Sequence, residues 1–144
     1  MQEQFPPPPA SRQEAFDRAA LHLLQTQTPS VRQGTNGSIC VYAGSGCALR
    51  PFAPLDPDEL RKWDVMGAID NLPTDWLPDH IAEDLKFYTA LQDAHDEGLN
   101  RGRIPEAAVW FANWRVRMRE LAQRFRLDAT IITDWEKLNV QAAD

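Results

Sequence analysis

The chain has 144 residues, of which 43% are hydrophobic and 25% charged, and its net charge is -6. This suits one globular domain with a substantial core, because a chain of roughly 150 residues buries about 70% of its unfolded surface. No apolar run approaches the roughly 20 residues that cross a bilayer, and residues 1–10 lack the basic and apolar blocks of a secretory signal. We therefore expect a cytosolic protein without a membrane partner, and two cysteines without a disulfide framework agree with a reducing compartment.

The chain begins with a proline-rich segment. Residues 1–10 contain four consecutive prolines at positions 6–9, which cannot donate helix or ladder hydrogen bonds and favour polyproline II. We predict a flexible arm over 1–10, followed by a single helical domain over 11–144.

A helix is predicted from Ser11 to about Thr26. Ser11 and Glu14 form a capping box, in which each side chain satisfies a free backbone N–H of the first turn. Apolar residues then recur at helical spacing, which predicts a core-facing stripe: Phe16, Ala19, Ala20, Leu23 and Leu24.

Residues 39–49 predict a short antiparallel β-hairpin. Their first half is β-branched and aromatic, and Gly44 and Ser45 suit a tight turn. A reversal there places Cys40 and Cys47 on one face of the ribbon.

That register puts Cys40 opposite Leu49 and diagonal to Cys47. Diagonal neighbours lie roughly 7 to 8 Å apart, at or beyond the limit of about 7 Å for an unstrained disulfide. Two alternatives remain: the thiols are buried as small apolar groups, or they share a metal ion.

Four more helices are expected after the first, and the last of them is short. Asp56, Pro57 and Glu59 begin a helix to about Trp63. A second helix starts at Pro78, with one stripe formed by Ile81, Leu85, Tyr88, Gln92 and His95.

The longest predicted helix follows Pro105 and should pack antiparallel to the helix before it. Its core seam is Phe111, Trp114, Met118, Leu121 and Phe125. Thr133 and Glu136 form another capping box, which predicts a last helix to about Val140. The fold class is thus mainly α (α+β), a bundle of about four to five helices with one hairpin.

Charge is unevenly distributed. Residues 56–84 contain nine acidic side chains against two basic ones, whereas residues 101–126 contain seven arginines against two glutamates. An acidic face can steer association with a basic partner, or it can simply keep the protein soluble. The partner-binding candidates in the acidic segment are Asp56, Asp58, Glu59, Trp63, Asp64, Asp70, Asp75 and Trp76.

One polar cluster could carry chemistry. Cys47 with His95 and Asp96 would be the minimum set for a thiolate nucleophile. However, neighbouring residues on a helix point about 100° apart, so we expect that Asp96 cannot orient the imidazole of His95. No phosphate-binding loop, metalloprotease helix or nucleophile elbow accompanies the cluster, and we expect a non-enzymatic protein.

The same cluster suggests a metal site. Cys40, Cys47, His95 and His22 carry the sulfur and imidazole donors that zinc accepts. The alternative, which we favour, is that His95 makes a structural hydrogen bond. We therefore expect no cofactor, and zinc is the metal ion to test for.

The motifs together resemble a family of small, mostly uncharacterised proteins of tailed phages and prophages. The resemblance covers roughly residues 15–128. It rests on four matches: Phe16, Asp17, His22, Leu23 and Leu24 with Gln25 or Gln27; Cys40, Tyr42, Cys47 and Ala48; Leu91, Gln92, His95 and Asp96; and Trp114 through Leu127 and Asp128. This sequence departs from the pattern at Leu49 and Arg50, where the family usually has a glycine, and its residues 55–80 are more acidic.

The resemblance implies a phage or prophage accessory protein in the bacterial host. With the acidic segment, it leads us to expect a protein that binds a host protein or nucleoprotein complex, for example as an anti-defence inhibitor of a CRISPR-like effector. One alternative is a thiol- or metal-dependent hydrolase using Cys47 and His95. A second is a nucleic-acid-binding protein using the arginine-rich helix over 105–126.

Overall fold

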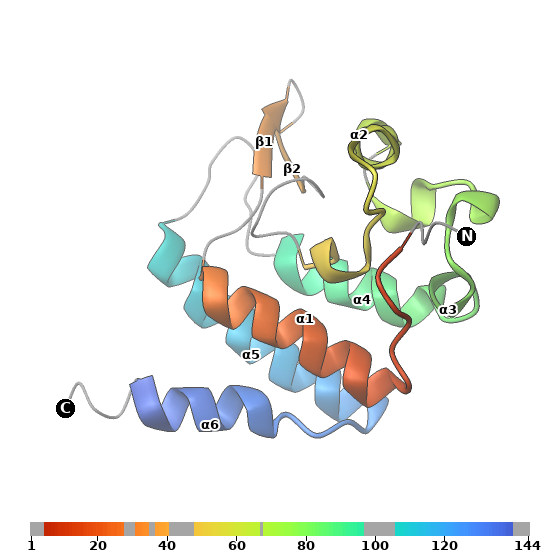
Figure 1. Cartoon of the computed structure of the whole chain (residues 1–144). Helices are drawn as coiled ribbons and strands as arrows, with labels where there is room; N and C mark the ends of the chain where they lie inside the picture. The colour runs from red at the N-terminus through yellow and green to blue at the C-terminus, as the bar shows by residue number, and fades with distance from the viewer. Residues whose placement is uncertain are drawn as a thin grey trace.

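The computed structural model describes residues 5–27, 31–34, 37–40, 48–66, 68–96 and 106–139, the two strands by their backbone alone. Within these ranges it is mainly helical, which confirms the helical character that the sequence predicts (Figure 1). The α-helices are α1 Arg12–Thr26, α2 Pro57–Met66, α3 Asp79–Ala82, α4 Leu85–Asp96, α5 Ala107–Phe125 and α6 Thr130–Asn139. Short 3-10 turns stand between them: η1 Arg50–Phe52, η2 Ile69–Asn71 and η3 Thr74–Trp76. None of the helices in the described ranges combines the length and apolar character that crossing a bilayer requires.

The first helix confirms its predicted cap. The hydroxyl of Ser11 accepts a hydrogen bond from the backbone N–H of Glu14 at 3.1 Å. The helix ends where Gln27 adopts a left-handed conformation and donates its N–H to the carbonyl of Leu23. The predicted stripe is buried in the core.

The predicted helix from Pro78 is divided into α3 and α4, so that the described residues hold six α-helical segments. At the break the N–H of Asp84 donates to the carbonyl of Ile81, three residues back rather than four. Arg12 of α1 binds the carboxylate of Asp84 through two hydrogen bonds, of 2.8 and 2.7 Å. This contact ties the start of α1 to the turn between α3 and α4.

Helices α4 and α5 run antiparallel side by side, as predicted (Figure 1). Trp110, Trp114 and Met118 of α5 are almost fully buried in the core. Helix α6 packs on α1 and begins at Thr130, earlier than predicted. Asp128 caps it by accepting hydrogen bonds from the N–H and hydroxyl of Thr130, so the predicted start at Thr133 was wrong.

The hairpin at 39–49 was also misplaced. The observed antiparallel ladder joins β1 Val31–Gly34 to β2 Gly37–Cys40, and Cys40 pairs with Val31 rather than with Leu49. Leu49 lies in a turn and is buried in the core. The predicted turn at 44–46 falls outside the described residues. Gly34 pairs with Gly37 at the end of the observed ladder.

Residues 5–10 of the predicted arm contact the helical body. The ring of Phe5 lies 6.0 Å from the ring of Trp63, centroid to centroid. The guanidinium of Arg18 donates a 2.6 Å hydrogen bond to the carbonyl of Pro7. The described part of the arm therefore crosses from α1 to α2, as Figure 1 shows.

Candidate functional site

The acidic surface consists of five exposed carboxylates: Asp56, Asp58, Glu59, Asp70 and Asp75. The first three stand at the start of α2, where Asp56 accepts a hydrogen bond from the N–H of Glu59 at 3.2 Å. The other two stand on the 3-10 turns η2 and η3 that follow. Asp64, the sixth predicted carboxylate, is half-buried.

Only part of this charge is neutralised nearby. Asp58 pairs with Arg61, and Glu59 pairs with Lys62 at 3.0 Å. Both pairs are exposed and stabilise the fold little. Within the described ranges, neither Asp70 nor Asp75 forms an ion pair. The surface therefore keeps a negative charge that could attract a basic partner.

Exposed apolar side chains accompany the carboxylates. Leu55 is 56% exposed and Val65 80% exposed, and Met66 stands beside Val65 at the end of α2. Sequence reasoning missed these residues. A signal was available for Val65, because Leu60 and Trp63 mark the buried face of α2 and Val65 is off that face. Apolar groups rimmed by charge are typical of protein-binding surfaces.

The two predicted tryptophan anchors are not equivalent. Trp63 is only 1% exposed, so its ring is not presented on the surface of the free protein. Phe5 of the arm covers it, a contact far apart in the sequence that local patterns do not reveal. Trp76 is half-buried and packs against the edge of the core.

His95 is fully buried at the end of α4. Its Nδ1 lies 2.7 Å from Oδ1 of Asp96, so the expectation that Asp96 could not orient this imidazole was wrong. Asp96 is the last residue of α4, where the side chain can fold back along the helix end. The backbone carbonyl of His95 accepts a 2.9 Å hydrogen bond from Nε1 of Trp110, and the two rings meet edge to face. These contacts fix the histidine in the core.

The other members of the predicted cluster are the two cysteines and His22. Cys47 lies outside the described residues, and Cys40 is described by its backbone alone. His22 is half-buried on α1. Among the described side chains, no group of three or more histidine, cysteine, aspartate or glutamate residues is arranged to hold a metal ion.

The arginine-rich helix α5 uses part of its charge internally. Arg115 and Arg119 bind the carboxylate of Glu136 on α6, at 3.1 and 2.5 Å. The guanidinium of Arg115 also lies over the rings of Phe111 and Trp135. These two arginines hold α6 against α5.

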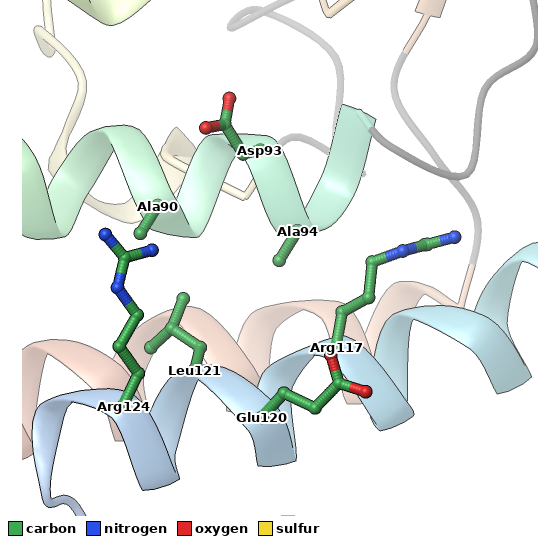
Figure 2. Close-up of a pocket in the computed structure, with 7 residues that line it drawn as sticks. All are labelled: Ala90, Asp93, Ala94, Arg117, Glu120, Leu121 and Arg124. Carbon is green, nitrogen blue, oxygen red and sulfur yellow. The ribbon is translucent and has the colours of Figure 1, made fainter.

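Two other arginines border a groove between α4 and α5 with a volume of about 180 Å³. Figure 2 shows Arg124 extending from α5 toward α4, with Leu121 pointing between the helices. Asp93 and Glu120 line the same groove as Arg117 and Arg124, together with Ala90 and Ala94. Because two carboxylates accompany two guanidinium groups, the groove lacks the net positive charge that a phosphate backbone selects.

Comparison with protein-family models, with curated proteins and with solved structures finds no match to this chain.

Proposed function

We propose that the protein is a non-enzymatic binding protein that docks on a basic surface of another macromolecule through its acidic surface. The observation that supports this most directly is the exposure of five carboxylates beside the exposed side chains of Leu55 and Val65. Unpaired carboxylates attract a basic partner over a distance, and the apolar groups supply area to bury once contact is made.

The resemblance to small phage and prophage proteins extends the proposal to a host target. A nucleoprotein complex of a defence system has a basic groove for its nucleic acid, and an acidic protein could occupy that groove. In this form the protein is an anti-defence inhibitor that competes with nucleic acid. Competition by a short duplex during capture would distinguish a nucleic-acid groove from another basic surface.

The test is affinity capture from the host with the tagged protein, followed by binding measurements with the purified partner. The informative variant carries Asp58→Lys and Asp70→Lys, which reverse two exposed charges outside the core. Each attraction becomes a repulsion, so we expect affinity to fall about tenfold or more at low salt. The wild-type affinity should itself weaken as salt is raised, since the charges are exposed.

A matched control changes the net charge by the same amount elsewhere. Glu120→Lys with Asp134→Lys reverses two exposed carboxylates on α5 and α6. In Figure 1, α6 lies at the opposite side of the molecule from α2. Equal losses of affinity in the two variants would indicate a general charge effect and would remove the proposal.

A further inference from the structure

A pocket of about 230 Å³ opens within the acidic surface. The arm contributes Phe5, α2 contributes Glu59 and Trp63, and η3 contributes Asp75 and Trp76. Three aromatic rings and two carboxylates thus converge on one cavity from three separate segments. Its volume suits a single long side chain rather than a helix or a strand.

Two rings of this pocket, those of Phe5 and Trp76, differ from several other aromatic rings of the protein in their contacts with cations. Elsewhere in the protein, arginines lie over rings at 4.8 to 5.8 Å, as Arg18 does over Phe52. Within the described part of the chain, no arginine or lysine lies over Phe5 or Trp76. The π-electron face of an aromatic ring attracts a cation, and tryptophan is the strongest of the three aromatic types.

The carboxylates add a second attraction for the same kind of group. Glu59 is held by Lys62 at 3.0 Å, which leaves it only partly available. Asp75 is exposed and lacks an ion pair among the described residues, so its charge can meet an incoming cation. A cation placed between Asp75 and the ring of Trp76 would gain both interactions.

We propose that this pocket receives a cationic side chain, arginine or lysine, from the partner protein. The inference rests on the proposed function, since it names the group by which the acidic surface recognises its basic partner. It also gives the proline-rich arm a role. The prolines at 6–9 restrict the backbone next to Phe5, whose ring contacts Trp63 and forms one wall of the pocket.

The test uses the full chain labelled with 5-fluorotryptophan and fluorine NMR. The protein has five tryptophans, and the resonance of Trp76 is assigned with Trp76→Phe. The probes are N-acetylargininamide, its lysine counterpart and the neutral analogue N-acetylcitrullinamide. We expect the Trp76 resonance to shift saturably with a cationic probe and not with citrulline, and the two cationic probes decide between arginine and lysine.

Two variants locate the binding. Asp75→Asn removes the charge without changing the volume, and Phe5→Leu removes the aromatic face while keeping an apolar wall. Each substitution should lower the affinity for the cationic probe by up to about fivefold. Asp134→Asn on α6 should leave this affinity unchanged. A Trp76 resonance that does not respond, or that responds equally to citrulline, would overturn the inference.

These outcomes are separable from those of the proposed function. If the Asp58 and Asp70 reversals abolish partner capture but Trp76 does not respond to cations, the docking surface stands and the pocket fails. If Trp76 responds but the reversals do not affect capture, the pocket binds a cation, but the proposed docking surface fails and with it the assignment of that cation to the partner.

Discussion

The Glu136→Gln substitution tests whether the arginines of α5 serve the fold. Glu136 of α6 accepts hydrogen bonds from Arg115 at 3.1 Å and from Arg119 at 2.5 Å. Glutamine has nearly the same shape and can still accept a hydrogen bond, but it carries no charge. The variant therefore removes the electrostatic part of the contact and little else.

The expected cost follows from burial. Exposed ion pairs contribute about 0.2–1 kcal/mol, whereas breaking a fully buried pair costs about 3–5 kcal/mol. Here Arg115 is 12% exposed, Glu136 27% and Arg119 35%, which places the contact between these limits. We expect a loss of about 1–2 kcal/mol, or a fall in Tm of about 3–8 °C for a chain of this length.

Urea denaturation followed by circular dichroism, with a thermal scan, measures this loss. Asp134→Asn is the matched control, because it removes the same charge from an exposed position of the same helix. It should change the free energy of unfolding by less than about 0.5 kcal/mol. Equal effects of the two substitutions would refute the assignment of Arg115 and Arg119 to the fold.

Three further predictions concern titration and charge. Burial raises the pKa of Tyr88 to about 12, so the neutral phenol is favoured in the folded state. The stability that it supports should be present below about pH 10 and be lost as the pH rises toward 12. Urea midpoints of the wild type and of Tyr88→Phe at pH 9 and 11 measure this loss. Burial, with a smaller contribution from Arg18, lowers the pKa of His80, so protonation opposes folding. The urea midpoint of the wild type should therefore decrease as the pH falls below about 6.5. In His80→Gln the urea midpoint should decrease less over the same pH range. On a heparin column at low salt the protein should flow through, because the groove that holds Arg117 and Arg124 also holds two carboxylates; retention that falls with salt would instead favour nucleic-acid binding.

The sequence predicts the helices whose signals are local. Ser11 with Glu14 and Asp56 with Glu59 cap their helices as expected, because a capping interaction spans three residues and needs no distant partner. The apolar stripe of α1 is likewise a property of spacing alone. Such features follow from residue order, whatever the rest of the chain does.

Features that depend on distant contacts were missed. The break between α3 and α4 coincides with Asp84, whose carboxylate is bound by Arg12, 72 residues away. Trp63 is in contact with Phe5, a residue of the proline-rich arm that is far from it in the sequence. The contact between His95 and Asp96 depends on where α4 ends, and helix ends are uncertain from sequence by a few residues.

The acidic surface was predicted from composition and its pocket was not. Counting charges over 56–84 was enough to locate the carboxylates, and most of those selected are exposed. The pocket needed a third segment, the arm, to bring an aromatic ring to η3 and α2. No periodicity connects positions 5, 63 and 76, so only the folded chain brings them together.

The central claim is that α2 and the turns η2 and η3 contact a basic partner. Hydrogen-exchange mass spectrometry of the purified complex against the free protein tests this most directly. We predict slower exchange over residues 57–76 and unchanged exchange over α6. Protection confined to α5 and α6, with residues 57–76 exchanging as in the free protein, would contradict the claim.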